Sequence, residues 1–265
     1  MNSLLKFLGE HSYHKSHYPT CKDYTFIKKM HVTDTTKVFM LEKHGRFYTL
    51  KVIDKKYKEY KHESKMLYEL EGKFFPKIIK TFEDNDHYFE LIKFKSGETI
   101  DLAVKDADLA TVEKWYYDLL LLLKSVHDKN ILHLDIKPTN ILVNNKGVHL
   151  IDFGSASFIG EERRYRSISL QYSAPELFIN EECQESKLTI EKRFKKDYTK
   201  TKMAVGRHTD IYSVALVFKE IIDADFKEAY ELDDYNFFIG VLAKSLGEDV
   251  NERYQSVDEI LDSRG

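Results

Sequence analysis

The chain has 265 residues, of which 42% are hydrophobic and 32% charged, so it can bury the core of one large or two small domains. Its formal net charge of −3 creates no global field that would favour nucleic acid or an anionic membrane. Two cysteines, Cys21 and Cys183, give no disulfide framework, and no apolar run is long enough to span a bilayer. We therefore expect a soluble, cytoplasmic protein.

The first third of the chain has the pattern of a β-rich domain. Residues 1–22 form an N-terminal extension before the first strand. Apolar runs then predict five strands, at 26–27, 38–41, 47–53, 78–82 and 88–94. Between the third and fourth, residues 57–71 predict a helix with Glu63, Leu67 and Leu70 on one face.

After residue 94 the pattern becomes helical. Residues 109–128 predict a long helix, and five consecutive leucines at 119–123 indicate burial nearly all round. Two short strands follow, at 141–143 and 148–151. Three further helices are predicted at 210–222, 235–246 and 256–262. The fold class is therefore α+β, with a small N-lobe at 23–94 and a larger helical C-lobe at 95–265. A cleft between two such lobes is a usual place for a cofactor.

Chemistry-bearing residues concentrate at the segment His133–Asn140 and at the triplet Asp152-Phe153-Gly154. They place two acids, a lysine and an amide oxygen close together along the chain. Carboxylate and amide oxygens suit magnesium, and a lysine can act as a point charge on phosphate. This set predicts transfer of a phosphoryl group held on magnesium, which needs positioning, a base and cations.

These segments resemble motifs of the eukaryotic-type (Hanks-type) protein kinase family, serine/threonine class. The resemblance runs from about Tyr24 to the C-terminus, with the motifs in the family's order. The matching segments are Tyr48–Lys51, Glu63, His133–Asn140, Asp152–Gly154, Ala174–Glu176, Asp210–Ser213 and Arg253. The resemblance implies a two-lobed kinase fold, ATP and Mg²⁺ as cofactors, and a protein substrate phosphorylated on serine or threonine.

The resemblance also implies roles for single residues. Asp135 would accept the proton of the acceptor hydroxyl, and Lys137 would steady the γ-phosphate. Asn140 and Asp152 would hold magnesium. Ser169 stands where the family places a hydroxyl that contacts the catalytic aspartate and lysine.

A second group of residues would bind the nucleotide. Lys51 would hold the α- and β-phosphates while paired with Glu63. Ile92 would guard the back of the adenine pocket, with Lys93–Lys95 as the hinge. The residues expected around the adenine ring are Val38, Thr49 and Leu142.

Some of these residues have a simpler interpretation. Lys51 alone could be a surface charge, although it lies in an apolar strand. Asp210 could simply cap a helix that begins at Ile211, and this is compatible with the role that the resemblance implies, which is to brace the backbone of the catalytic loop. Glu176 and Arg253 are structural in either case, as a buried ion pair.

The loop expected to cover the phosphates departs from the family pattern. It reads His31–Val38 and lacks all three glycines, which normally allow a close backbone approach to phosphate. One alternative is a stiff hairpin that no longer cradles nucleotide. The other is a lid that uses the hydroxyls of Thr33 and Thr36, Lys37, or main-chain amides.

Two further departures concern regulation and partners. Leu134 stands where many relatives carry an arginine that pairs with a phosphate on the activation loop, so we expect activity without that phosphate. A basic insertion at about 180–207 holds, within 187–207, eight Lys or Arg and two acids. It is either a solvated segment or a docking surface for an acidic or phosphate-rich partner.

Two alternatives to an active protein kinase stay open. The missing glycines are compatible with a pseudokinase, which would act as a binding scaffold. A small-molecule kinase has a similar two-lobed fold, but Ala174–Glu176 and Lys137-Pro138 belong to protein-substrate recognition and disfavour it.

Overall fold

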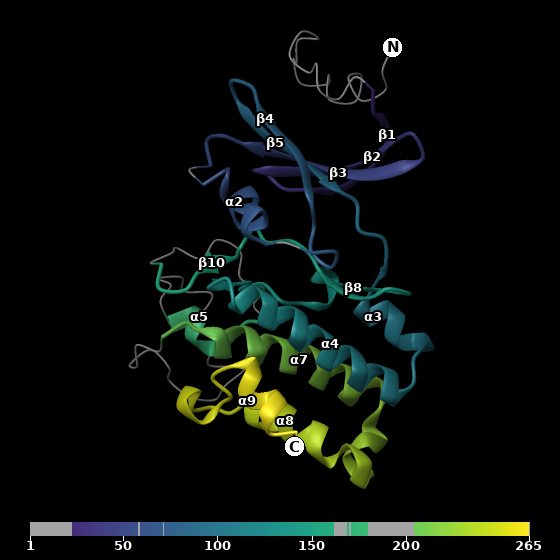
Figure 1. The fold of residues 1–265 in the computed structure, drawn as a ribbon, viewed down its shortest axis with the longest axis vertical. Coiled ribbons are helices and arrows are strands. Elements are labelled where there is room, and N and C mark those ends of the chain that lie inside the picture. The colour runs from purple at the N-terminus through teal and green to yellow at the C-terminus, as the bar shows by residue number, and fades with distance from the viewer. Residues whose placement is uncertain are drawn as a thin grey trace. The chain divides into compact units, whose positions relative to one another are not determined.

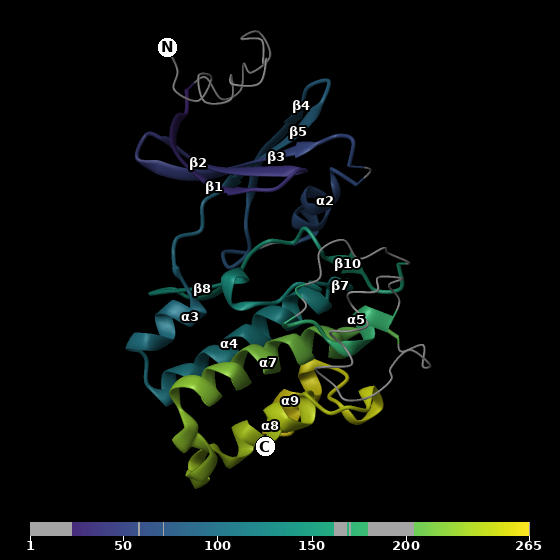
Figure 2. The same ribbon diagram turned by 180° about the vertical axis from the view of Figure 1, so that it is seen from behind.

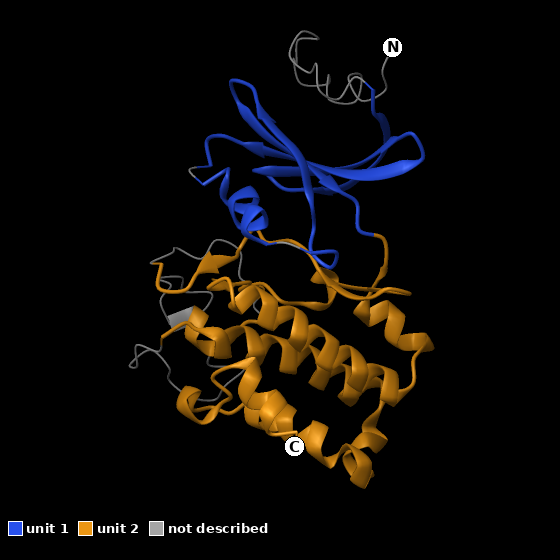
Figure 3. Ribbon diagram, viewed as in Figure 1, with its two compact units in different colours: residues 1–95 blue, residues 96–265 orange. Residues whose placement is uncertain are grey.

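A computed structural model describes residues 23–57, 59–70, 72–161, 169, 171–179 and 204–264. The chain divides into two compact units, Met1–Lys95 and Ser96–Gly265, which Figure 3 colours separately. The extension 1–22 and the basic insertion up to residue 203 lie outside the described residues, as do Cys21 and Cys183. The described part confirms the α+β class, because the first unit is mainly sheet and the second mainly helix.

The first unit contains a five-stranded antiparallel sheet with the strand order β1-β2-β3-β5-β4 (Figure 1). All five predicted strands are confirmed, although the first is much longer than the predicted 26–27 and the fifth is shifted by one residue. They are β1 (Thr25–Val32), β2 (Thr36–Lys43), β3 (Arg46–Asp54), β4 (Ile78–Glu83) and β5 (His87–Lys93). Alternation of side chains along the strands gives this sheet two different faces.

One face of the sheet carries the apolar core of this unit. Its buried members come from the three central strands: Phe39, Leu41, Leu50, Val52, Phe89 and Leu91. Tyr24, Phe26, Tyr48 and Phe82 cover their margins. The opposite face carries the residues between these positions, so it is the face on which polar side chains can meet.

The helix of the first unit is shorter than the sequence predicts. Helix α2 spans His62–Glu69, not 57–71. Before it, the amide of Tyr60 donates to the carbonyl of Tyr57, and that of His62 to Glu59, three residues back in each case. Such bonds close single turns rather than a continuous α-helix, so the periodic pattern extends beyond the helix itself.

The second unit is built on two long helices, α4 (Leu109–His127) and α7 (Arg207–Asp225). They lie side by side in both views (Figure 1, Figure 2). Shorter helices complete the described part of this unit: α3 (Ile100–Ala103), α5 (Pro175–Ile179), α8 (Asn236–Ser245) and α9 (Val257–Asp262). Single 3-10 turns occur at Val104–Asp106, Pro138–Asn140, Lys227–Glu231, Asp233–Tyr235 and Val250–Glu252.

Helix α4 shows where the leucine pattern predicts burial correctly and where it does not. Asp108 caps its first turn by accepting the amide of Thr111 at 2.8 Å. Four of the five consecutive leucines are buried, but Leu121 is 51% exposed. A helix turns about 100° per residue, so a run of five must place one side chain on the solvent side unless protein surrounds the helix.

Short strands frame the segment 133–157 of the second unit. Strands β6 (Glu98–Thr99), β8 (Ile141–Asn144) and β9 (Gly147–Leu150) form one small sheet. Strands β7 (Ile131–Leu132) and β10 (Ser157–Phe158) pair as another. The segment His133–Asn140 therefore begins at the end of β7 and ends at the start of β8, which fixes both of its ends.

Candidate active site

A buried aspartate from α7 holds the backbone of the 133–140 loop. Oδ1 of Asp210 accepts the amide of Leu134 at 2.8 Å, and Oδ2 accepts the amide of His133 at 2.8 Å. Nε2 of His127 lies 3.0 Å from Oδ2. Burial works against ionisation of Asp210, but the hydrogen bond and charge of His127 outweigh it and hold the pKa below its usual range. The carboxylate is therefore available to bind both amides.

The hydrogen bonds from Asp210 hold the loop where its backbone takes a conformation that residues other than glycine rarely adopt. Leu134 has a φ of 62°, in the left-handed region. Asp210 lies inside the first turn of α7, which begins at Arg207 rather than at Ile211. The side chain of Asp210 bonds the loop backbone, as the family resemblance implies, rather than acting as the N-cap of a helix that begins at Ile211.

His133 orients the backbone of Asp135, two residues further along the loop. Its Nδ1 accepts the amide of Asp135 at 3.3 Å, and its Nε2 lies 3.2 Å from the carbonyl of Ile151. These two bonds require a neutral ring with the proton on Nε2. Burial lowers the pKa of His133, which favours that neutral form. The ring also packs edge-on against Phe153, with 4.7 Å between centroids.

Three side chains converge on the carboxylate of Asp135. The hydroxyl of Ser169 donates to Oδ1 at 2.6 Å, and Nζ of Lys137 donates to Oδ2 at 2.7 Å. Lys137 also donates to the Ser169 hydroxyl at 2.9 Å, which closes a triangle of hydrogen bonds. Asn140 adds a bond from Nδ2 to Oδ2 at 3.2 Å. The structure thus brings together four of the residues that the sequence predicts for the catalytic site.

The donor set of Asn140 and Asp152 fits a magnesium ion. Asn140 is buried and uses Nδ2 to donate to the carbonyl of Asp135 at 2.9 Å, so its amide oxygen faces the other way. Asp152 is partly buried and has a φ of 65°. A carboxylate and an amide oxygen are hard ligands of the kind that magnesium prefers.

In the first unit, Lys51 and Glu63 form a close ion pair. Nζ of Lys51 lies 2.7 and 2.6 Å from the two carboxylate oxygens of Glu63. The side chains are 14% and 7% exposed, so solvent screens this pair weakly. The pairing brings α2 and β3 together at the position that the sequence predicts.

The register of the sheet places the predicted nucleotide residues of this unit on one face. Val38 lies opposite Lys51, and Thr49 lies opposite Ile92. Because side chains alternate along each strand, these four share the face opposite the apolar core. The hinge residues Lys93 and Lys95 follow on β5 and just beyond it, and Lys95 donates to the carbonyl of Lys73. Leu142 lies in β8 of the second unit and is buried.

The glycine-free turn between β1 and β2 closes on its own threonines. Thr33 accepts the amide of Thr36 on its hydroxyl at 3.0 Å, and its own amide donates to the carbonyl of Thr36 at 2.8 Å. No residue of this turn has a positive φ, so glycine is not needed to form it. Both threonines thus have partners inside the hairpin, and their contact with nucleotide stays a prediction.

Comparison with known proteins identifies the family. The family model described as the protein kinase domain matches residues 33–227, which is more than half of the chain. The chain belongs to the protein kinase family. Its arrangement, with a β-sheet N-terminal region and a helical C-terminal region, is the α+β fold of a kinase.

Individual relatives of this chain are named as protein kinases, and one of them, cek1 of Schizosaccharomyces pombe, is named as a serine/threonine-protein kinase, 25% identical over 163 residues that cover 56% of this chain and 12% of the relative. The human 3-phosphoinositide-dependent protein kinase 1 is 32% identical over 161 residues, covering 54% of this chain and 29% of the relative. The cAMP-dependent protein kinase type 3 of Saccharomyces cerevisiae is 31% identical over 144 residues, covering 50% of this chain and 36% of the relative. The chain therefore spans well under half the length of these relatives.

The chain carries an apolar cluster at Leu134, where many members of the family carry an arginine. Leu134 is 3% exposed and packs with Leu132, Leu177 and Val205. Leu177 belongs to α5, and Val205 precedes α7. The cluster therefore joins the 133–140 loop to the segment after Ala174 by apolar packing.

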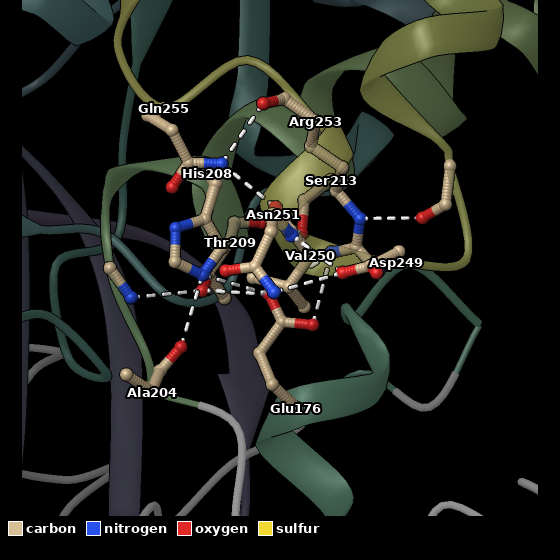
Figure 4. Close-up of polar contacts among 12 residues, drawn as sticks. Glu176, Ala204, His208, Thr209, Ser213, Asp249, Val250, Asn251, Arg253 and Gln255 are labelled. Carbon is tan, nitrogen blue, oxygen red and sulfur yellow. Dashed lines mark hydrogen bonds and ion pairs between the residues drawn. The ribbon is translucent and has the colours of Figure 1, made fainter.

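A buried ion pair anchors the end of that segment (Figure 4). Nη1 of Arg253 lies 3.0 and 3.2 Å from the carboxylate oxygens of Glu176, and both side chains are fully buried. The predicted pair is confirmed. Figure 4 also shows Thr209, whose hydroxyl donates to Glu176 at 2.9 Å, and His208, whose Nε2 lies 3.6 Å away. These two extra partners were not apparent from the sequence.

The sequence reasoning also missed polar residues buried beside the predicted ones. His127 binds Asp210, and Ser64 and Glu90 lie next to the Lys51–Glu63 pair. A signal existed for Glu90, because an acid inside the apolar run Tyr88–Ile92 needs a partner.

Among the described residues, no helix is both long and apolar enough to cross a membrane.

Proposed function

We propose that this chain is an ATP- and magnesium-dependent protein kinase that phosphorylates serine or threonine. The observation that carries the proposal is the carboxylate of Asp135, which already accepts a hydroxyl, that of Ser169, at 2.6 Å. A substrate hydroxyl that makes the same bond is positioned to lose its proton to Asp135. The sequence similarity to a relative named as a serine/threonine-protein kinase, cek1 of Schizosaccharomyces pombe, supports the choice of substrate class.

The neighbours of Asp135 have separate tasks in this proposal. Lys137 holds one carboxylate oxygen and places a positive charge beside the transferred group. Asn140 and Asp152 would hold magnesium, which supplies cationic charge that stabilises the phosphoryl group during transfer. The braces from Asp210 and His133 fix the backbone, so the carboxylate is positioned before substrate binds.

We also propose that a phosphate on the activation segment, residues 152–176, is not required. In a kinase with arginine at position 134, a phosphate gives that cation a partner and thereby orders the segment. Here Leu134, Leu177 and Val205 make the connection by apolar packing, which needs no phosphate. The α5 end of the segment is held independently by Glu176 and Arg253.

Transfer of radiolabelled phosphate from ATP to peptides that contain serine or threonine tests the activity. We expect Asp135→Ala to lower kcat by roughly 100-fold or more, because a positioned base contributes about that much. Asp106→Ala changes an exposed aspartate in the same unit and serves as the matched control. Equal and negligible transfer by wild type and Asp135→Ala, with nucleotide still bound, would identify a pseudokinase. Transfer only to a metabolite would identify a small-molecule kinase.

The independence from phosphorylation is tested with Tyr165→Phe and Ser167→Ala, two positions that lie outside the described residues. Both variants should keep the wild-type rate, and phosphatase treatment should leave it unchanged. A rate that follows a phosphate at either position contradicts this part of the proposal. Ser169→Ala is a separate case, since its hydroxyl bonds Asp135 and Lys137 and its loss lowers the rate for that reason alone.

A further inference from the structure

A third charged residue lies beside the Lys51–Glu63 pair. Glu90 is in the middle of β5 and has no exposed surface. In the register of the sheet it is directly opposite Lys51 on β3 and opposite Thr81 on β4. Directly opposite residues of an antiparallel pair have Cβ atoms about 5 Å apart and share a face. Glu90 therefore lies on the face that also carries the predicted nucleotide residues.

Glu90 caps helix α2 from the sheet. Its Oε1 accepts the amide of Ser64 at 3.0 Å, in the first turn of the helix. The amides of a first turn have no partner within the helix, and Lys61 at the N-cap makes no side-chain cap. Ser64 directly follows Glu63, which binds Lys51. The bond from Glu90 thus fixes the turn of α2 that carries Glu63.

The second oxygen of Glu90 shows which charge state the site can hold. Oε2 is buried and has no hydrogen-bond partner among the described residues. A buried carboxylate oxygen without a partner is costly when ionised and tolerable when neutral. Burial, followed by the nearby charge of Glu63, raises the pKa of Glu90 to about 8. The carboxyl is therefore mainly neutral at pH 7.

The charged groups that face Glu90 within this unit come from two elements. Lys51 faces it from β3 and favours its ionised form, whereas Glu63 from α2 opposes ionisation. Strand β4 contributes Thr81, which does not titrate in this range. Once ionised, Glu90 is a second carboxylate next to one ammonium group. It repels Glu63 and offers Lys51 an alternative partner on the neighbouring strand.

We propose that Glu90 is a positioning residue whose neutral form caps α2 and leaves Lys51 paired with Glu63, and whose ionisation weakens that pairing and slows phosphoryl transfer. The part that concerns phosphoryl transfer rests on the proposed function. Glu90 acts through Lys51 and Glu63 and does not itself need to touch the nucleotide.

The pH dependence of kcat/KM for wild type and Glu90→Gln tests the proposal. Glutamine keeps an oxygen that accepts the Ser64 amide but cannot ionise. Near pH 7 we expect the two rates to agree within about threefold. At pH 9, one unit above the pKa, roughly a tenth of wild-type Glu90 remains neutral, so the wild-type rate should fall by up to roughly tenfold while that of Glu90→Gln is kept. Identical alkaline limbs would overturn the proposal.

Two further variants separate positioning from general damage. Glu69→Gln changes an exposed glutamate of α2 and should retain the wild-type pH profile. Glu90→Leu removes the acceptor of the Ser64 amide, and its rate should be low at every pH. Full activity of Glu90→Leu would contradict the role of Glu90 as a helix cap.

Urea unfolding between pH 6 and pH 9 gives a readout that needs no enzymatic activity. A raised pKa means that the folded state binds the extra proton, so wild-type stability should fall as pH rises from about 4.5 to 8, and the Glu90→Gln variant should lack that fall. Introducing Glu63→Gln into both proteins should shrink the difference between them. Inactivity at every pH with this unfolding difference intact would overturn the proposed function but support the coupling. The absence of any unfolding difference would overturn the coupling itself.

Discussion

The 133–140 loop and the β1–β2 turn are both short connections at sites of expected function, but they are stabilised differently. The loop is held by buried partners distant in sequence, with Asp210 on α7 as the principal one. The turn is exposed and closes through bonds between Thr33 and Thr36, three residues apart. In a loop held by tertiary contacts, a key residue cannot be substituted without affecting its distant partners. In a turn closed by its own residues, threonine can replace glycine and the turn keeps its shape.

The largest expected effect comes from removing the brace of the loop. In Asp210→Asn, one of the two amides at His133 and Leu134 loses its acceptor inside the protein. We expect a loss of about 3 kcal/mol in the free energy of unfolding, measured in urea, and a matching loss of activity. Asp258→Asn changes an exposed aspartate of α9 and is the control. A loss below about 1 kcal/mol would show that the loop does not depend on this distant partner.

A smaller effect should appear as acid sensitivity of the same loop. His133 has a pKa lowered by burial, so the unfolded state binds a proton that the folded state refuses. Stability should therefore fall as pH drops below about 6.5, by at most about 1.4 kcal/mol per pH unit from this residue. His133→Asn, which cannot take up that proton, should flatten the decline. An unchanged decline would assign the acid sensitivity to other groups.

The smallest effect is expected at the β1–β2 turn. Thr33→Ala removes the hydroxyl that accepts the amide of Thr36, and should cost under about 1 kcal/mol because hydroxyl-closed turns are weak and exposed. Thr35→Ala, in the same turn, is the matched control. The KM for ATP should not change if the hydroxyl serves only the hairpin. A large rise in KM would instead show that Thr33 also holds nucleotide.

Sequence reasoning works best where one motif contains the whole site. Asp135, Lys137 and Asn140 lie within six residues, so their meeting follows from the chain itself, and the structure shows their bonds. It also located the strands, because alternation of apolar residues reflects burial of one sheet face. Lys51 and Glu63 are further apart, and their pairing was predicted from the family resemblance, whereas the residue pattern alone indicated only that Glu63 is partly buried and needs a partner.

What the sequence did not reveal depends on register between distant elements. Glu90 meets Ser64 because β5 pairs with β3 and contacts α2, and a shift of one residue in the strand register would turn Glu90 to the other face of the sheet. The bonds of Asp210 to the loop were expected only from the family resemblance, because its partners are 76 and 77 positions away and local patterning indicates no more than a helix cap. The exposure of Leu121 likewise depends on which side of α4 faces solvent.

The ion pair between Glu176 and Arg253 sets a minimum length for an independently folding C-terminal unit. The family match ends at residue 227, but Arg253 lies beyond it. A chain shortened to the matched range would keep Glu176 in the interior without its cation, at a cost of about 3–5 kcal/mol. That is a large part of the total stability of an ordinary domain. The boundary of family similarity and the boundary of autonomous folding therefore lie at different points in this chain.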